Sequence, residues 1–227
     1  MNMFNVCIIA EGNEEYQFFE TMKNSGVIPS NLSIDVYNAE GYGYVAPLFQ
    51  EYNSYELYDC VTCVYDVDYR QFEKDSPYLR VFRQLIDILG NEDAAKAVSF
   101  CTNPNFLQIY LLSMRPLSEI ALFATSKKTN TPFVHLCWPE IAKKKVDENG
   151  KDQTKDYDAT KWQLQIMNAH FLEEKQSYIT LLDHLNDLPN DYLLPHYPGS
   201  NVGSLIRALL FGDTMFFKQI IEKTDDD

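Results

Sequence analysis

The chain has 227 residues, of which 45% are hydrophobic and 14% aromatic, so it can bury a core of its own. Its 33 acidic and 19 basic residues leave a formal net charge of −14, which argues against a protein that grips long stretches of nucleic acid by neutralising phosphates. The sequence holds no run of 18 apolar residues and no basic leader, so we expect a cytoplasmic protein with no membrane partner.

The first hundred residues alternate between short apolar runs and amphipathic segments. Strands are predicted at 5–10, 32–36, 58–65 and 97–101, with helices at 15–23, around 48–52 and at 77–89 between them. The glycine-bearing stretch 39–47, AEGYGYVAP, has the composition of a loop. The alternation of strands and helices predicts an α/β fold with a mostly parallel sheet covered by helices on both faces.

Helical patterns dominate after residue 105, at 106–114, 117–125, 162–185, 202–211 and 214–223. The most polar stretch, 143–161, is expected to be an insertion loop or a hinge, and the proline-rich residues 186–200 are expected to be irregular. We therefore predict a catalytic α/β domain at 1–115 and a mainly helical extension at 116–227. The extension would pack on the first domain and offer a surface to a substrate or a partner.

Two predicted strands end in carboxylates. Asp66 and Asp68 close the run YDCVTCVYDVD, and residues two apart lie on the same face of an extended chain. The first apolar run is followed by Glu11, with Glu15 one turn into the next helix. If the two strands are neighbours in a parallel sheet, these four side chains share the crevice where open α/β sheets bind ligands. Because Mg²⁺ prefers carboxylate oxygens, these four residues are the predicted metal ligands and catalytic residues.

The cysteines do not indicate a disulfide framework. There are five of them, an odd number, and most lie inside apolar runs, as expected for reduced and buried thiols. Cys60 and Cys63 form a C-x-x-C, but within a strand their side chains point to opposite faces. No second C-x-x-C or histidine pair follows, so a zinc or redox site is not favoured.

Four short segments carry motifs that occur in a fixed order. IIAEGNEEYQFFE has an E-G-x-x-E turn, and VYDVD has a D-x-D. Together with SFCTNPNFLQIYLLSM and YPGSNVGSLIRAL, these segments resemble the Toprim superfamily and, within it, the RloB-like proteins of bacterial defence loci. The resemblance places the family glutamates at Glu11 and Glu15 and the D-x-D at Asp66 and Asp68. The two later segments match the family at Asn103, Pro104, Phe106, Leu111, Leu112, Pro198, Ser200, Val202 and Leu205.

The chain departs from the family pattern at a few positions. Leu107 stands where the family has a glutamate, so any role of that carboxylate is lost or moved. Tyr110 replaces a tryptophan, and Gly199 and Asn201 stand where small and hydroxylated residues are usual.

The resemblance implies a Toprim-like, Rossmannoid fold and a metal-dependent endonuclease that hydrolyses RNA or DNA. Such a protein would act as a toxin in antiviral defence by abortive infection, controlled by a partner or a signal. One Mg²⁺ or Mn²⁺ ion would be held by Asp66 and Asp68, and a second by Glu11 and Glu15. Glu11 could instead act as a general acid or base.

Four further residues are predicted to contact the substrate. Arg70 follows Asp68 by two residues and is the candidate phosphate clamp. Asn103 follows the strand predicted at 97–101, although an Asn-Pro pair after a strand is also typical of a turn. Lys161 and Ser200 are assigned by the resemblance. Lys161 lies in the polar stretch 143–161, where a lysine can also be solvated without any contact to substrate.

Other functions stay open. The chain could be a catalytically weak binding or regulatory subunit of an ATPase-containing defence complex, or a small-nucleotide phosphoesterase that uses the same carboxylates. The four carboxylates argue against the first alternative, whereas the acidic composition and Leu107 argue against the nuclease. A homodimer is compatible with the apolar residues Phe211, Met215, Phe216 and Phe217 of the last helices.

Overall fold

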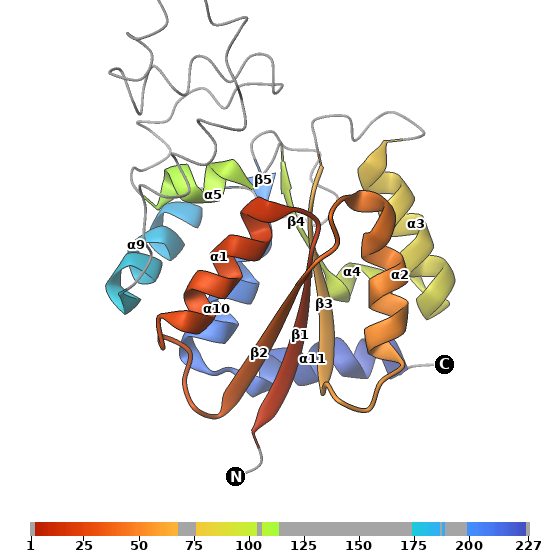
Figure 1. Cartoon of the computed structure of the whole chain (residues 1–227), viewed down its shortest axis with the longest axis horizontal. Helices are drawn as coiled ribbons and strands as arrows, with labels where there is room; N and C mark the ends of the chain where they lie inside the picture. The colour runs from red at the N-terminus through yellow and green to blue at the C-terminus, as the bar shows by residue number, and fades with distance from the viewer. Residues whose placement is uncertain are drawn as a thin grey trace, which may run out of the picture.

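Five strands form one sheet, in the order β2-β1-β3-β4-β5 (Figure 1). The structure is a computed structural model that describes residues 3–67, 76–103, 106–113, 174–186, 188 and 199–225. Four strands run parallel, and the short β5 pairs antiparallel with β4. Their bounds are β1 (Phe4–Ala10), β2 (Leu32–Asn38), β3 (Cys60–Asp66), β4 (Ser99–Asn103) and β5 (Gly199–Ser200).

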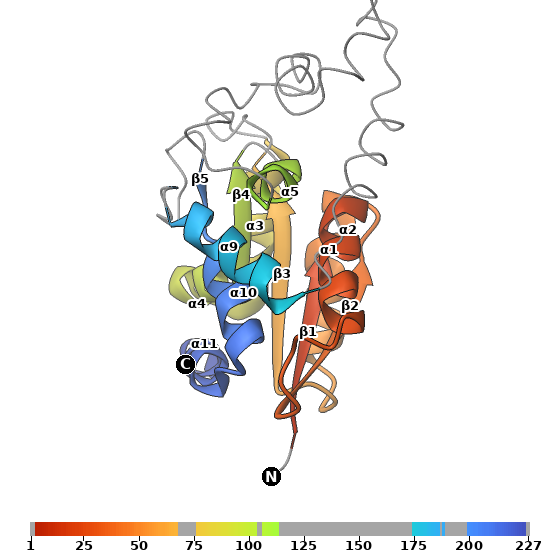
Figure 2. The same ribbon diagram turned by 90° about the vertical axis from the view of Figure 1, so that its left-hand side faces the viewer.

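Helices cover both faces of this sheet, as the alternating pattern predicts. On one face, α2 packs on β1, β3 and α3, and α4 packs on α3 and β3, while α1, α5, α9 and α10 cover the other face (Figures 1 and 2). α11 lies near the amino ends of the strands, against α4 and β3. The helices are α1 (Asn13–Asn24), α2 (Tyr42–Asn53), α3 (Pro77–Leu89), α4 (Glu92–Val98), α5 (Leu107–Leu112), α9 (Lys175–Leu185), α10 (Val202–Phe211) and α11 (Thr214–Asp225).

The burial of the strands follows from their position in the sheet. β1 and β3 are central, and their apolar runs are buried almost throughout, as in a parallel sheet covered on both faces. β2 lies at the edge and alternates between buried and half-buried residues. The four described cysteines, Cys7, Cys60, Cys63 and Cys101, are buried free thiols, as predicted.

A set of aromatic rings holds the helices of one face together. We call Phe18, Phe19, Phe106, Tyr110 and Tyr178 the aromatic cluster. The Phe18 ring of α1 lies 5.4 Å from Phe106, 5.8 Å from Tyr110 and 5.8 Å from Tyr178, measured between ring centroids. All five rings are buried, and their contacts link α1, α5 and α9 through one apolar cluster.

Most predicted elements are found, with three differences. α4 was not predicted, and it displaces the start of β4 from residue 97 to Ser99. α2 begins at Tyr42, inside the stretch expected to be a loop. β5 lies in the region expected to be irregular. Among the described residues, no helix has the length and apolar character that crossing a membrane requires.

Some predictions fall outside the described residues. They include the domain boundary at 115, the helix at 117–125, the polar stretch 143–161 and the first part of the helix at 162–185. The last part of that helix is α9. Residues 199–225 contribute β5 to the same sheet and side chains of α10 and α11 to the same core.

Candidate functional site

The strand order places the ends of β1 and β3 at a change of direction in the sheet. β2 lies on one side of β1, whereas β3 and β4 follow on the other, so the chain winds outward in both directions from this point. In open α/β sheets, ligands bind at the carboxyl ends of the strands where the winding reverses. Glu11 and Asp66 stand at this point, immediately after β1 and at the end of β3.

A hydrogen bond joins the ends of the two strands. The backbone N–H of Asp66 donates to Glu11 Oε2 at 2.9 Å, across 55 positions of sequence. The backbone N–H of Glu11 in turn donates to the carbonyl of Val64 at 2.9 Å. The parallel register, in which Ala10 faces Val64, brings these groups together. The Glu11 carboxylate is therefore held at the tip of β3.

Glu15 lies beside this pair and is almost entirely buried, with 2% of its surface exposed. It occupies the third position of α1, and its Oε2 accepts a hydrogen bond from the backbone N–H of Gly12 at 3.0 Å. This is the reciprocal half of a capping box, so Glu15 also stabilises the start of the helix.

Burial governs the ionisation of Glu15. It raises the pKa of the carboxyl group from 4.5 to about 8, with further increases from the charges of Glu14 and Glu11. Hydrogen bonding to its own backbone and to Asp66 acts in the opposite direction. At neutral pH the Glu15 carboxyl group is therefore largely protonated, while a cation placed beside it would favour the ionised form.

This shift predicts that Glu15 lowers the stability of the fold as the pH rises. The folded-state pKa lies above the ordinary value, so the unfolded chain loses its proton first. The contribution of Glu15 to the free energy of unfolding is complete below about pH 4.5 and is lost as the pH rises towards 8. Each unit of pKa difference corresponds to ~1.4 kcal/mol. The free energy of unfolding is measured by urea denaturation without divalent cations. Between pH 5 and pH 8 it should fall more for the wild type than for Glu15→Gln, by on the order of several kcal/mol.

The variant keeps an oxygen that can accept from Gly12, so the comparison isolates the ionisation. Glu92→Gln, at an exposed position of α4, should follow the wild-type profile. Parallel profiles of the wild type and Glu15→Gln would contradict the assignment.

A strained turn brings the start of α2 to the same edge. Glu40 has φ +56° and Gly41 has φ +129°, both in the region that disfavours side chains. The Gly41 N–H donates to the carbonyl of Glu11 at 2.7 Å, and the Ala39 N–H donates to Ala10 at 2.8 Å. Two tyrosines follow directly, with 38% of Tyr42 and 65% of Tyr44 exposed. The turn thus holds the backbone of Gly41, directly before the first residue of α2, against the backbone of Glu11.

Asn103 and Ser200 lie on the neighbouring strands. Thr102 faces Asp66 in the parallel register, and Asn103 follows it as the buried last residue of β4. The Ser200 hydroxyl lies 3.1 Å from Thr102 Oγ1 and donates to the carbonyl of Cys101 at 3.2 Å. These contacts give Ser200 a role in joining β5 to β4, and its contact with substrate stays a prediction.

Sequence reasoning treated Asn201 only as a departure from the family pattern. Its Oδ1 accepts a hydrogen bond from the Cys101 N–H at 2.6 Å, and its Nδ2 donates to the Ser99 carbonyl at 3.0 Å. The side-chain amide thereby bonds to one N–H and one carbonyl group of β4, as the backbone of a neighbouring strand would. No local signal in the sequence marks this role, because its partners lie about a hundred positions away.

Asn201→Ala is expected to lower the free energy of unfolding by about 1–3 kcal/mol, because two backbone groups of β4 lose their partner. Chemical denaturation followed by circular dichroism measures the change. Ser204→Ala, which removes an exposed hydroxyl bonded to the carbonyl of Asn201, should change the stability by less than about 0.5 kcal/mol. Equal effects of the two substitutions would show that the Asn201 amide does not stabilise β4.

Three predicted site residues, Asp68, Arg70 and Lys161, lie outside the described residues. Leu107 begins α5, and the hydroxyl of Tyr110 in the same helix donates to the carbonyl of Glu14 at 2.8 Å. The structure therefore brings together Glu11, Glu15 and Asp66 of the four predicted carboxylates.

The donor chemistry of these residues fits a hard divalent cation. Glu11, Glu15 and Asp66 offer carboxylate oxygens, the ligands that Mg²⁺ and Mn²⁺ prefer. Within the described part of the chain, no three His, Cys, Asp or Glu side chains are grouped closely enough to form a metal site. A complete site would thus need a contribution from Asp68 or a rearrangement of the three carboxylates.

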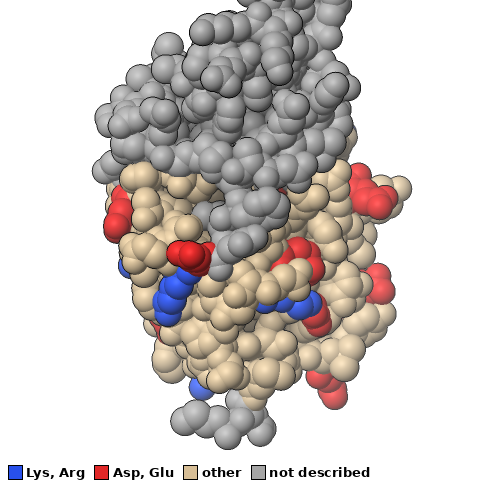
Figure 3. All heavy atoms as spheres, turned by 60° about the vertical axis from the view of Figure 1, so that its left-hand side comes forward, with Lys and Arg blue, Asp and Glu red and all other residues tan. Residues whose placement is uncertain are grey.

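The surface charge agrees with the acidic composition. On the face shown in Figure 3, the Lys and Arg side chains of the described residues are scattered among Asp and Glu side chains. Lys23 pairs with Asp35 at 2.8 Å, and Lys96 pairs with Glu92 at 2.8 Å. On this face, the Lys and Arg side chains of the described residues therefore form no continuous basic surface.

Comparisons with protein-family models, with characterised proteins and with solved structures find no match to this chain. The resemblance to the Toprim superfamily consequently depends on the motifs in the sequence.

Proposed function

We propose that the protein is a metal-dependent nuclease of Toprim type, related to the RloB-like proteins, that hydrolyses RNA or DNA in bacterial antiviral defence. The observation that carries the proposal is the contact between Glu11 and Asp66, 2.9 Å from carboxylate oxygen to backbone nitrogen, at the carboxyl edge where the sheet changes direction. Carboxylates at this edge stand where open α/β sheets bind ligands, and they can hold the cation that metal-dependent phosphoryl transfer uses.

The predicted carboxylates form the cation site in this proposal. Asp66 and Glu11 hold the cation, together with Asp68. When bound, Mg²⁺ or Mn²⁺ would polarise the scissile phosphate and stabilise the developing charge. Burial raises the pKa of Glu15 to about 8 without a cation, and a bound cation would favour its ionised form, so that Glu15 can join Glu11 as a ligand. The backbone N–H of Asp66 keeps the Glu11 carboxylate in place for this chemistry.

The exposed tyrosines at the start of α2 favour a substrate with unpaired bases. Aromatic rings stack on bases that are not in a duplex, and such stacking contributes about 1–3 kcal/mol per base. Tyr44 is 65% exposed, and its helix begins at the residue after Gly41, which is bonded to Glu11. Stacking requires no basic surface, so it is compatible with a net charge of −14.

Tyr44→Ala is therefore expected to weaken the binding of single-stranded oligonucleotides by roughly tenfold, and Tyr44→Phe to leave it unchanged. Fluorescence anisotropy in the presence of Ca²⁺ measures affinity without depending on cleavage. Tyr55→Ala, which removes an exposed ring two residues beyond the last residue of α2, serves as the matched control. Equal loss in Tyr44→Ala and Tyr55→Ala would remove the support for stacking.

The direct test of the function is cleavage by the purified full chain. Transfer RNA, single-stranded RNA, single-stranded DNA and duplex DNA are incubated with Mg²⁺, with Mn²⁺ or with EDTA. We expect cleavage of a single-stranded or structured substrate that EDTA abolishes, together with cation binding by titration calorimetry. Cleavage that persists in EDTA, or an absence of both cleavage and cation binding, would refute the nuclease.

A second candidate is a regulatory subunit that works beside an ATPase. It is favoured by the backbone contacts of Glu11 and Glu15, since each carboxylate accepts an N–H and so already has a structural use. A chain that binds an ATPase partner but neither cuts nucleic acid nor takes up cations would establish this candidate. Cation-dependent hydrolysis of mononucleotides alone would instead establish a small-nucleotide phosphoesterase.

A further inference from the structure

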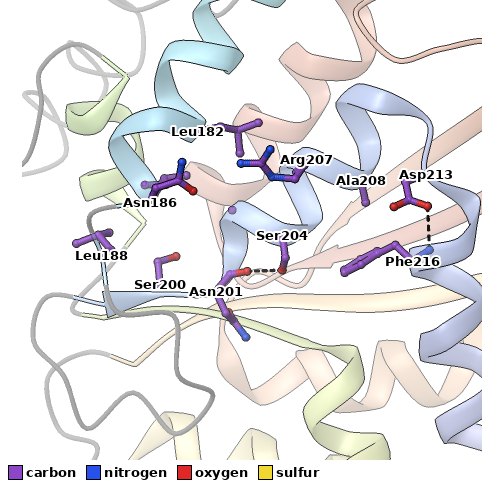
Figure 4. Close-up of a pocket in the computed structure, with 12 residues that line it drawn as sticks. Leu182, Asn186, Leu188, Ser200, Asn201, Ser204, Arg207, Ala208, Asp213 and Phe216 are labelled. Carbon is purple, nitrogen blue, oxygen red and sulfur yellow. Dashed lines mark hydrogen bonds between the residues drawn. The ribbon is translucent and has the colours of Figure 1, made fainter.

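A hollow of about 300 Å³ lies between α9, α10 and the start of α11, beside β5 (Figure 4). One part of its wall is apolar and includes Leu182, Leu185 and Phe216. The other part is polar and includes Asn186, Ser204 and Arg207. Its size is at the lower end of the range of small-molecule sites, ~300–1,000 Å³, and such sites combine apolar walls with a few polar groups. None of Glu11, Glu15 and Asp66 lines it.

Arg207 is the basic residue in the wall of this hollow. Its side chain extends from α10 towards Leu182 of α9 and Asn186, the residue that follows α9 (Figure 4). It forms no ion pair or hydrogen bond with any residue that the structure describes. Arg207 is exposed, so its guanidinium group is open to a ligand from solvent.

The carboxylate in the same wall does not neutralise Arg207. Asp213 Oδ1 accepts the backbone N–H groups of Met215 at 3.1 Å and of Phe216 at 3.2 Å, so it caps α11 (Figure 4). Ser204 uses its hydroxyl as a donor to the carbonyl of Asn201 at 2.7 Å. That hydroxyl oxygen can still accept a hydrogen bond, as can the amide oxygen of Asn186.

The geometry points to a binding site for a small organic anion that carries a flat or apolar body. We propose that Arg207 binds the carboxylate or phosphate group of this ligand, because a guanidinium group pairs with either in a bidentate way. Phe216 and the two leucines would contact the apolar body, and aromatic faces favour a flat ring. Asn186 would bond to a polar group of the same ligand. This site is separate from the carboxylates at the edge of the sheet and does not depend on the nuclease proposal.

The proposal is tested with phenyl phosphate as the probe, by saturation-transfer NMR and titration calorimetry on the full chain. Inorganic phosphate lacks the apolar body and phenol lacks the anion, so each should bind at least roughly tenfold more weakly than phenyl phosphate. Adenosine 5′-monophosphate and benzoate distinguish a nucleotide ligand from a carboxylic acid ligand.

Two variants locate the binding. Arg207→Gln should weaken phenyl phosphate binding by roughly tenfold or more, and Ser204→Trp should abolish it by filling the hollow. Arg80→Gln removes an exposed arginine from α3, on the opposite face of the sheet, and should bind as the wild type does. The proposal is overturned if wild type does not bind phenyl phosphate or benzoate at millimolar concentration. It is equally overturned if Arg207→Gln and Ser204→Trp retain wild-type affinity.

Discussion

Replacing Asp66 by asparagine is expected to reduce cation-dependent cleavage of nucleic acid by about 100-fold or more. The substitution removes one negative charge from the candidate site but keeps the shape of the side chain. It also keeps the backbone N–H that donates to Glu11 Oε2 at 2.9 Å, because that donor belongs to the main chain. The ends of β1 and β3 should therefore stay joined. Initial rates with saturating Mg²⁺ or Mn²⁺ measure the effect.

A matched control separates loss of charge at the site from loss of charge in general. Asp93→Asn removes a carboxylate at an exposed position of α4, where Asp93 pairs with Lys96 at 3.3 Å. This variant should keep wild-type activity, and both variants should show thermal unfolding close to that of the wild type. If Asp66→Asn cleaves at the wild-type rate, Asp66 does not hold the cation and the proposed mechanism fails. If both variants lose activity equally, the effect is one of overall charge.

Phe18→Ala is expected to lower the free energy of unfolding by about 3–5 kcal/mol, the largest effect on stability that we predict. Phe18 is 1% exposed and stands at the centre of the aromatic cluster. Its ring contacts Phe106 and Tyr110 of the α5 region and Tyr178 of α9, at centroid distances of 5.4–5.8 Å. The substitution leaves a cavity and removes ring contacts that join three helices. Urea denaturation followed by circular dichroism measures the change.

The control for this prediction is the same substitution at an exposed phenylalanine. Phe211 is 52% exposed and has the Lys175 ammonium group 5.1 Å from its ring centroid. Phe211→Ala should therefore cost less than about 1 kcal/mol. Because the cluster holds α5 and α9 on α1, hydrogen exchange in Phe18→Ala should rise more in α5 and α9 than in β1 and β3. A uniform rise, or a loss no greater than that of Phe211→Ala, would contradict the role assigned to the cluster.

Local signals account for the elements that the sequence predicted well. The helix predicted at 77–89 is observed with those bounds, as α3. Ser76 caps it by accepting the N–H of Leu79, a proline stands in its first turn, and Gly90 ends it with φ +73°. The apolar runs at 5–10 and 58–65 likewise predicted strands, and these are β1 and β3, whose apolar residues are buried because helices cover both faces of a parallel sheet.

The elements that were missed depend on signals that are weak or distant. α4 has seven residues, and its AAKAV sequence merges with the apolar start of β4, although Asn91 caps it through Ala94. α2 begins earlier than predicted because Glu40 and Gly41 complete the turn within three residues of the end of β2. β5 has only two residues and is held by Asn201 and Ser200 against β4, so no local pattern could reveal it.

By itself, the sequence determined the fold class, the four parallel strands and the presence of carboxylates after two of them. These features depend on the periodicity of apolar residues and on the residues that follow each strand, which are local properties of the chain. Tertiary structure alone decided which strands are neighbours and in what register they pair. That register brings Asp66 to Glu11 across 55 positions, and it buries Glu15 beside them. The physical reason is that hydrogen bonds between strands and the burial of a charge arise from contacts between distant segments, which composition and spacing do not encode.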